Sequence, residues 1–453
     1  MRVCAPCAIV LAACATGDPA GTRATGVSTI APRDFASGTR LRATYDVVGG
    51  EVETFVSFHD AALDLDCAFG DDPGPGPTWW CLPLVVARHD PRTGPFVDLG
   101  CHEPAAIALP DEHAAHAVLS PLDACTSAPT VRVALAPAVE HVYGLAPDGS
   151  CVRGGTARVQ RLGDVVPIDT FVSAREVATG SGRIQTRTLV ASDGAAFVTG
   201  GWDARLAMAV SATRGRWTPS RAAFAGAGDD RFSDAACKAI AATKIGHDAQ
   251  CPLAAAFVFS DSCGDGAWHT LGAADAALRR LDDKGSCVGV SPNDGVLGFA
   301  LGAEMPIETF AAAATADVGG AHAKRRGYLA DGPPVAWRET VDAATGEPCV
   351  VAPAADGTQR CLPAVEEFVA YYTDSTCSRT AFAHARTGCP ADAPHFVRDA
   401  VTPRAFVVGE ALPAIFTSAG GACTPFTPVV PSDLFAADEA APDRFPLAVR
   451  VTE

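Results

Sequence analysis

Three histidines that lie close together in the chain have the residue type of a transition-metal site. His102 directly follows Cys101, and His113 and His116 are three residues apart. Imidazole and thiolate groups are ligands that zinc and related ions prefer. A polar loop with exposed histidines gives the same pattern, and the sequence favours that interpretation because it has 11 histidines in all. His102, His113 and His116 are therefore only a weak metal site, and no cofactor is expected.

Two adjacent tryptophans are the main sign of ligand recognition. Trp79 and Trp80 immediately precede Cys81. Tryptophans on exposed loops are suited to contacts with sugars or proteins, whereas a tryptophan beside a bonded cysteine more often belongs to the core. The pair is a candidate binding site, but packing is the favoured interpretation.

The sequence has no recognisable catalytic motif. It contains neither the Gly-x-Ser-x-Gly turn of many esterases nor the His-Glu-x-x-His helix of zinc proteases, and no phosphate-binding loop. Two carboxylates brought together from distant strands would leave no local motif, so a glycoside hydrolase stays open as an alternative.

The cysteines predict a set of disulfides. Of the 17 cysteines, 14 follow Cys14, and an even number in an exported protein is typical of a bonded framework. The cysteines that we expect in disulfides are Cys67, Cys81, Cys125, Cys151, Cys237, Cys251, Cys263, Cys287, Cys349, Cys361, Cys377 and Cys389.

Two pairing schemes fit the cysteine spacing. Pairing of neighbours gives 67–81, 237–251, 377–389, 125–151, 263–287 and 349–361, and leaves Cys101 and Cys423 as free thiols or as a bond that closes a ring. The other scheme nests the pairs, so that the third cysteine of each repeat joins the sixth and the fourth joins the fifth. It leaves Cys125 and Cys389 unpaired. Spacing alone does not choose between the schemes.

These cysteines recur because the chain repeats itself three times. A short phrase with proline, an acidic residue and phenylalanine occurs at 32–35, 167–171, 306–310 and 431–435. It divides the chain into modules at 28–166, 167–305 and 306–430, followed by a tail at 431–453 with a partial fourth repeat. Repetition of this kind indicates one structural unit used several times.

Each module has the pattern of a β-protein. The openings at 37–45 and 181–189 alternate apolar and polar residues, and the opening at 320–328 corresponds to them in position. A turn with glycine follows each opening, as in a hairpin. Helices are expected only at 273–281 and, more weakly, at 311–316. We therefore predict an all-β fold of three disulfide-stapled modules, with a closed, propeller-like array favoured over tandem β-sandwiches.

Composition excludes several functions. The net charge of −17 is unsuitable for nucleic-acid binding, which requires clustered basic residues. No run of 18 apolar residues is present, so we expect membrane contact only through a lipid anchor. Residues 1–14 resemble a lipoprotein signal that ends at an acylated Cys14, and 15–30 have the composition of a flexible tether.

Whole strings of the sequence resemble a known group of proteins. The strings at 302–307, 360–363 and 371–377 are similar to those of uncharacterised cysteine-rich repeat lipoproteins from high-GC Gram-negative bacteria. The resemblance implies an exported protein and supplies no catalytic residue.

Together these observations predict a structural or binding protein of the cell envelope. It would be an outer-membrane lipoprotein or a secreted protein, with another exported protein or a glycan as its partner. The alternative is a secreted hydrolase of the β-propeller type with acidic residues around a central channel.

Overall fold

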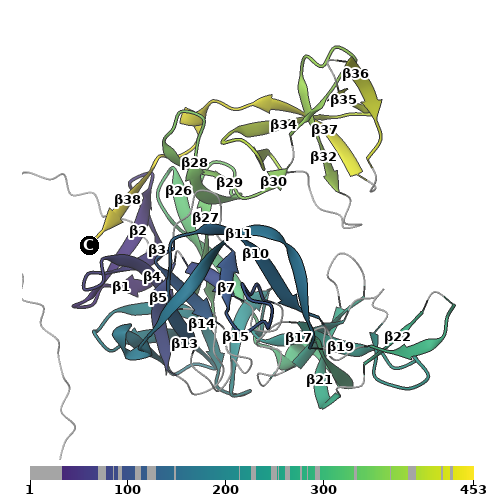
Figure 1. Ribbon diagram of the computed structural model, residues 1–453. Coiled ribbons are helices and arrows are strands. Elements are labelled where there is room, and N and C mark those ends of the chain that lie inside the picture. Colours follow the sequence, from purple (N-terminus) through teal and green to yellow (C-terminus); the bar gives the residue numbers. More distant parts are fainter. Residues whose placement is uncertain are drawn as a thin grey trace, which may run out of the picture.

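The protein is built almost entirely from β-strands (Figure 1). The computed structural model describes residues 33–453 except 70–77, 85, 90–93, 108–113, 120–128, 147–148, 214, 226–230, 246–252, 254, 261–265, 276–277, 283, 291–295, 331–333, 368, 386–393, 420–421 and 429–431. Within this part the chain forms 38 strands and short 3-10 turns, with no α-helix. The predicted all-β class is confirmed. The signal, Cys14 and the tether lie outside the described residues.

Both predicted helices are wrong. Residues 273–281 include the end of β21 (Gly266–Asp275) and all of β22 (Arg279–Leu281), and residues 314–316 begin β25 (Ala314–Gly319). Alanine has the highest intrinsic helix propensity, but differences in propensity are small, and here strand pairing overrides that preference. Ala274, for example, lies opposite Phe299 in an antiparallel pair.

Along the chain, a meander of antiparallel strands alternates three times with an outer unit of further strands. The first meander contains β2 (Leu41–Val48), β3 (Val52–Asp60), β4 (Leu65–Phe69) and β5 (Trp79–Pro83). The second contains β12 (Ser173–Thr179), β13 (Ile184–Ala191), β14 (Ala196–Asp203), β15 (Met208–Thr213) and β16 (Arg216–Pro219). The third contains β25, β26 (Ala323–Leu329), β27 (Pro334–Asp342), β28 (Pro348–Pro353) and β29 (Gln359–Pro363).

The outer units share one topology. The first comprises β6 (Val86–His89), β7 (Ala105–Ile107), β8 (His116–Leu119), β9 (Thr130–Ala134), β10 (Ala138–Leu145) and β11 (Cys151–Val166). The second comprises β17 (Ala222–Ala225), β18 (Arg231–Phe232), β19 (Ala241–Ile245), β20 (Ala255–Phe259), β21, β22, β23 (Cys287–Gly289) and β24 (Val296–Met305). The third comprises β30 (Glu366–Glu367), β31 (Tyr371–Tyr372), β32 (Thr380–Ala385), β33 (Phe396–Asp399), β34 (Ala405–Ala411), β35 (Ile415–Ala419), β36 (Ala422–Phe426) and β37 (Ser432–Glu439).

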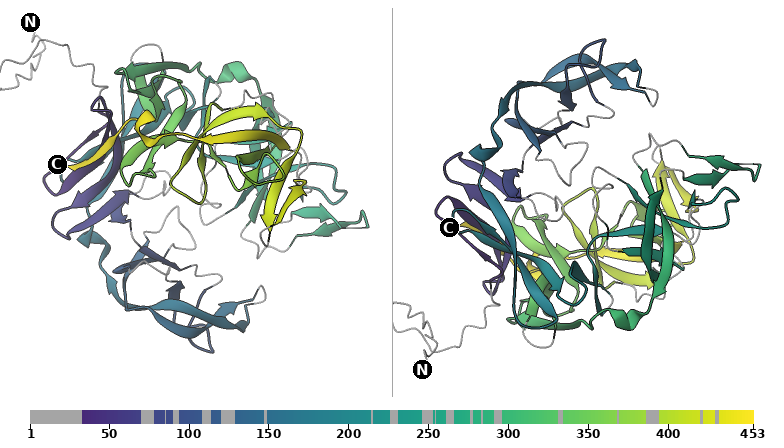
Figure 2. Two further views of the ribbon diagram at one scale, coloured as in Figure 1. Left: turned by 90° about the horizontal axis from the view of Figure 1, so that it is seen from above. Right: turned by 90° about the horizontal axis from the view of Figure 1, so that it is seen from below.

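In the described part of each outer unit, one strand pair is parallel and the others are antiparallel. The parallel pairs are β6 with β8, β17 with β20 and β30 with β33. In the second unit, β17, β19, β24, β21 and β20 form a closed barrel. Figure 2 shows the first outer unit, in blue, on one side of the meanders and the other two units elsewhere around them.

A 3-10 turn with the same backbone geometry follows each outer unit. These turns are η1 (Ile168–Thr170), η3 (Ile307–Thr309) and η4 (Pro442–Arg444). Each ends at a buried phenylalanine, namely Phe171, Phe310 or Phe445. The fourth copy of the boundary phrase is therefore at 441–445. Residues 432–439, which the sequence assigns to the tail, form β37 and pair with β32 and β34 in the third outer unit.

The three meanders are joined in a cycle by equivalent backbone hydrogen bonds. The amide of Cys81 in the first meander donates to the carbonyl of Val172, which leads into the second, at 2.9 Å. The amide of Trp217 donates in the same way to Ala311 at the third meander. The amide of Cys361 in the third meander donates to Pro446, just before the last strand.

That last strand, β38 (Ala448–Thr452), returns to the first meander. It pairs antiparallel with β2, where Thr452 lies opposite Thr44 and Ala448 opposite Val48. Figure 1 shows β38, in yellow, alongside β2, in purple. In the other two meanders the equivalent first strands, β12 and β25, follow directly from the preceding outer unit. The tail thus closes the cycle through backbone pairing.

Apolar side chains fill all three joints between meanders. One buried cluster joins the first and second meanders, a second joins the second and third, and another includes residues of the third, the first and β38. Each meander therefore contacts both of the others. The propeller-like arrangement itself stays a prediction.

The disulfides follow the nested scheme at the positions described. The bonds are Cys67–Cys81, Cys101–Cys151, Cys237–Cys287, Cys349–Cys361 and Cys377–Cys423. The predicted neighbour bonds 125–151, 237–251, 263–287 and 377–389 are therefore wrong. So is the proposal that Cys101 and Cys423 are free or joined across the ring. Cys125, Cys251, Cys263 and Cys389 lie outside the described residues.

Strand pairing explains why the third cysteine of a repeat meets the sixth. The segment before each third cysteine is hydrogen-bonded to the strand before the sixth, as where β31 pairs with β35 in the third unit. The third cysteines, Cys101, Cys237 and Cys377, have φ between 50° and 55°. Each closes a turn in which its amide donates to the carbonyl of the aspartate three residues earlier, at 3.2 Å. The turn aims the sulfur at the neighbouring strand.

Candidate functional site

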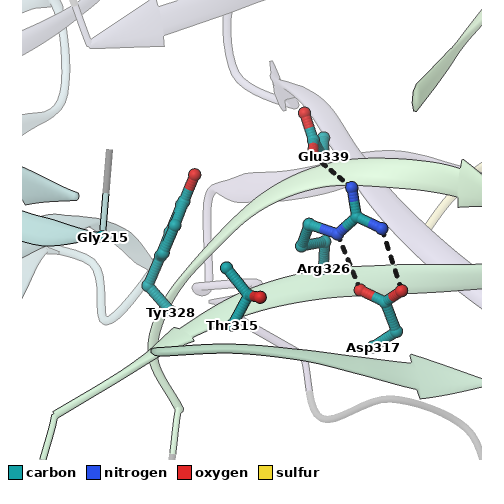
Figure 3. A pocket seen from close by; sticks show the side chains of 6 residues that line it. All are labelled: Gly215, Thr315, Asp317, Arg326, Tyr328 and Glu339. Carbon is teal, nitrogen blue, oxygen red and sulfur yellow. Dashed lines mark hydrogen bonds and ion pairs between the residues drawn. The ribbon is translucent and has the colours of Figure 1, made fainter. Parts of the chain in front are cut away.

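A cavity of about 440 Å³ opens on the third meander, beside a turn of the second. Its walls come from adjacent strands: β25 and β26 supply two residues each and β27 one (Figure 3). The lining residues are Gly215, Thr315, Asp317, Arg326, Tyr328 and Glu339. Alternation along the strands places Thr315 with Asp317, and Arg326 with Tyr328, on the same face of the sheet.

Arg326 is the centre of this pocket. Its Nε donates to Oδ1 of Asp317 at 2.8 Å, and Nη2 donates to Oδ2 at 3.0 Å. Nη1 donates to Glu339 at 3.2 Å, and Nη2 also donates to the carbonyl of Gly346 at 3.1 Å. The guanidinium lowers the pKa of Asp317, so this carboxylate stays ionised under mildly acidic conditions.

The pocket keeps hydrogen-bonding capacity for a ligand. A guanidinium has five N–H groups, and the four bonds above leave one on Nη1 without a partner among the described residues. Each carboxylate oxygen has further lone pairs. The Tyr328 hydroxyl accepts a bond from Arg338 at 2.8 Å and retains its own proton to donate. Thr315 is exposed and adds another hydroxyl.

The equivalent positions in the other meanders are occupied differently. Arg326 lies opposite Asp317, as Arg187 lies opposite Ala178 in the second meander and Thr44 opposite Thr452 in the first. Arg187 bonds Glu176 at 2.7 Å, and its side chain is 8% exposed, compared with 24% for Arg326. The third meander thus has the more accessible arginine at this position.

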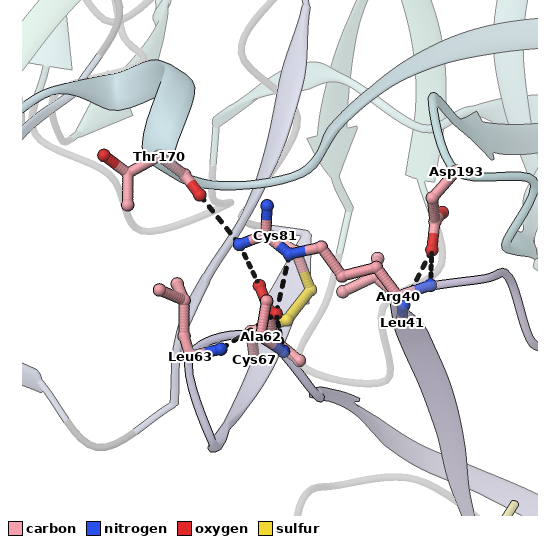
Figure 4. A network of polar contacts seen from close by, with 9 residues as sticks. Arg40, Leu41, Ala62, Leu63, Cys67, Cys81, Thr170 and Asp193 are labelled. Atoms are coloured by element: carbon pink, nitrogen blue, oxygen red, sulfur yellow. Dashed lines mark hydrogen bonds and ion pairs between the residues drawn. A yellow bond between two sulfur atoms is a disulfide. The ribbon is translucent and has the colours of Figure 1, made fainter.

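A second polar network, at Arg40, is structural. Arg40 donates to both carboxylate oxygens of Asp60 at 2.7 Å and to the carbonyl of Thr170 at 2.8 Å (Figure 4). In the second meander, Arg183 bonds Asp203 and the carbonyl of Thr309 in the same way. Because the network recurs and holds the 3-10 turns in place, it belongs to the joints between the meanders.

A carboxylate from a neighbouring meander completes that joint. Oδ2 of Asp193 in the second meander accepts hydrogen bonds from the amides of Arg40 and Leu41, at 2.9 and 2.6 Å (Figure 4). At the joint between the first and third meanders, Glu51 accepts from the amides of Ala321, His322 and Ala323.

The tryptophan pair lies at the joint between the first two meanders. Trp79 is 6% exposed and belongs to the apolar cluster there, so it offers almost no surface to a ligand. Trp80 is half-buried and lies opposite Ser173 in β12. Both tryptophans therefore take part in strand pairing.

The candidate metal ligands are not brought together in the part of the chain that is described. The His102 side chain is 86% exposed and lies 3.5 Å from Asp98. His116 packs edge-on against Phe171, and burial lowers its pKa. Cys101 is in a disulfide, and no group of three metal-ligating side chains occurs among the described residues. His113 lies outside them.

The pocket was not predicted from the sequence, although one sign of it was present. The third repeat has two adjacent arginines, Arg325 and Arg326, where the first has Ala43 and Thr44. Arg325 forms a buried ion pair with Asp34 at 2.8 Å, so only its neighbour faces the pocket. Departures from an internal repeat were thus a better guide than local motifs.

The disulfides among the described residues indicate an oxidising, extracytoplasmic compartment. The comparisons with known proteins assign no activity. The part of the chain that is described contains no helix long and apolar enough to span a membrane. Neither the curated proteins nor the solved structures include a match to the chain. A family described as "Family of unknown function (DUF7481)" matches residues 23–310, more than half of the sequence. The chain therefore belongs to the DUF7481 family.

Proposed function

We propose that this is an exported binding protein whose third meander takes a glycan. The observation that carries the proposal is the pocket around Arg326. At the position of Arg326 the first meander has Thr44 and the second has Arg187, and both are buried. The third meander has an accessible arginine there, in an open cavity.

The lining of the pocket suits hydroxyl groups. A sugar hydroxyl donates one hydrogen bond and accepts others, so a site that binds sugars needs donors and acceptors at short spacing. Asp317 and Glu339 supply acceptors, Arg326 supplies an N–H, and Thr315 supplies a hydroxyl. The bonds between Arg326 and Asp317 fix both groups before a ligand arrives, which reduces the entropy lost on binding.

Titration calorimetry with soluble oligosaccharides tests the proposal. The wild-type protein should bind at least one, and Arg326→Gln should weaken binding by tenfold or more because it removes the charge and the forked geometry. Arg161→Gln is a matched control, since Arg161 pairs with Glu140 in the first outer unit, away from the pocket. Circular dichroism checks that both variants are folded.

Three outcomes would contradict this proposal. The first is a wild-type protein that binds no saccharide of any charge, and the second is an Arg326→Gln variant that binds as well as the wild type. The third is turnover of a glycan, ester or peptide that disappears in Asp317→Asn, which would favour the alternative of a secreted hydrolase.

We also propose that the protein is anchored in the cell envelope through acylated Cys14. Support comes from the lipobox-like residues Leu11 to Cys14 and the tether composition that follows. The full-length protein should partition into detergent, and Cys14→Ser should abolish this. Recovery of an unacylated mature protein that starts at Thr16 would indicate plain secretion.

A further inference from the structure

A β-bulge places a second arginine next to the pocket. All three meanders have a register shift of one residue at the same position. It lies between β2 and β3 after Thr44, between β13 and β14 after Arg187, and between β26 and β27 after Arg326. The extra residue is Val56 in the first meander, Thr199 in the second and Arg338 in the third. Bulges redirect side chains and are common beside functional sites.

The side chain of Arg338 is linked to the pocket by a hydrogen bond to Tyr328. It is exposed, its Nη1 donates to the Tyr328 hydroxyl at 2.8 Å, and its guanidinium carbon lies 5.9 Å from the centre of that ring. It also follows Trp337 and precedes Glu339, the pocket carboxylate that bonds Arg326. The position at which the other meanders have valine or threonine therefore holds a cation at the edge of the cavity.

With this second arginine the pocket is bordered by charges of both signs. Arg326, Arg338 and Lys324, whose charge acts on Asp317, are positive, and Asp317 and Glu339 are negative. An anionic ligand would meet the two carboxylates, and a cationic ligand would meet the cations. A neutral ligand avoids both repulsions and still finds donors and acceptors.

We infer that the pocket selects an uncharged glycan over acidic and amino sugars, and that Arg338 sets this selectivity by excluding cations at the edge. The inference rests on the proposed function, because it names the ligand class of the same pocket. Arg338 acts here as a specificity-determining residue, while Arg326 binds the ligand.

The experiment compares three series of oligosaccharides of equal length: neutral glucans, oligouronates and oligoglucosamines. Calorimetry at pH 6, where the amino groups are charged, should give wild-type affinity for the neutral series at least tenfold above that for either charged series. Arg338→Glu should raise the affinity for oligoglucosamine relative to the neutral glucan by tenfold or more. Arg338→Lys should keep the wild-type order, since it keeps the charge.

Arg153→Glu provides a control for general electrostatic effects. Arg153 is an exposed arginine in the first outer unit that contacts His141, and its reversal changes the net charge equally. It should leave the selectivity unchanged. Tighter wild-type binding of a charged series would overturn the inference while the glycan proposal stands, and so would an unaltered preference in Arg338→Glu. Absence of binding to all three series would instead contradict the proposed function.

Discussion

The second meander has a buried tryptophan at a position where the first and third meanders have a disulfide. In the first, Cys67 lies opposite Pro83 and bonds Cys81 two residues before it. In the third, Cys349 lies opposite Pro363 and bonds Cys361.

In the second meander Val210 lies opposite Pro219, and Trp217 takes the position of the second cysteine. Trp217 is fully buried, and its indole N–H donates to the carbonyl of Leu329 in the third meander at 3.3 Å. A third position changes with it. Phe58 lies opposite Cys67, whereas Gly201 lies opposite Val210.

The glycine makes room for the indole. A Cβ at Gly201 would lie 2.8 Å from Cζ3 of Trp217, closer than two carbon atoms approach without strain. In the second meander three positions therefore differ together from the other two meanders, because the indole needs the space that a side chain at the glycine would fill.

The largest expected effect comes from removing the tryptophan. Trp217→Ala should destabilise the protein by about 3–5 kcal/mol, because it leaves a large cavity at the joint between the second and third meanders. Chemical denaturation followed by fluorescence and circular dichroism measures the loss. A loss below about 1 kcal/mol would mean that the joint does not depend on this side chain.

Introducing a disulfide into the second meander extends this test. In the triple variant Gly201→Thr, Val210→Cys and Trp217→Cys, the second meander acquires the residues of the third, where Thr340 lies opposite Cys349. We expect a disulfide in peptide maps and recovery of at least half of the stability lost in Trp217→Ala. Failure of the cysteines to pair would show that the meanders differ in backbone as well as in side chains.

The next largest effect is expected from removing the disulfide of the first meander, Cys67–Cys81. The double variant Cys67→Ala and Cys81→Ala should lower the free energy of unfolding by about 3 kcal/mol, since the bond closes a loop of 14 residues. Treatment of the wild type with a reductant is not equivalent, because it also opens the outer units. Equal stability of variant and wild type would mean that the buried contacts suffice without the bond.

Gly201→Ala should lower the free energy of unfolding by a smaller amount, about 1–3 kcal/mol, because the added methyl group crowds Trp217. The double change Gly201→Ala and Trp217→Phe provides the control, because the smaller ring relieves the contact. If both variants are destabilised equally relative to their parents, the glycine is needed for its backbone and not for space.

The repeat made much of this architecture predictable. Cysteines that are present together at 67 and 81, and at 349 and 361, but absent together from the second repeat, indicated which pair is bonded. The later cysteines were ambiguous because their partner is fixed by long-range strand pairing, which spacing does not encode. The boundary phrase at 431–435 was misleading because a similar short pattern occurs in β37.

The candidate site was harder to predict than the fold. Trp79 has the residue type of a binding site, yet strand pairing with β12 buries it in a joint. Arg326 has no motif around it, and its role depends on residues from two further strands. A pocket assembled from neighbouring strands becomes visible only when the register is known.

The smallest expected effect concerns the joint between the two disulfide-bearing meanders. Burial raises the pKa of Glu51, but hydrogen bonds from the amides of His322, Ala323 and Ala321 outweigh it, so the net pKa is lowered. A carboxyl group with a lowered pKa in the folded state stabilises the protein above its unfolded pKa of about 4.3, and this contribution is lost as the pH falls through the folded value. Glu51→Gln should therefore cost about 1 kcal/mol at pH 7.

Because both proteins carry a neutral side chain in acid, the difference between wild type and Glu51→Gln should shrink below about pH 4. Asp193→Asn is the matched change at the joint between the first and second meanders, where the carboxylate accepts hydrogen bonds from the amides of Arg40 and Leu41. Urea denaturation at a series of pH values measures the difference. A cost for Glu51→Gln that is the same at pH 3 and pH 7 would show that the side chain acts through its shape and not its charge, so that the joint closed by β38 is held by backbone pairing and apolar contact alone.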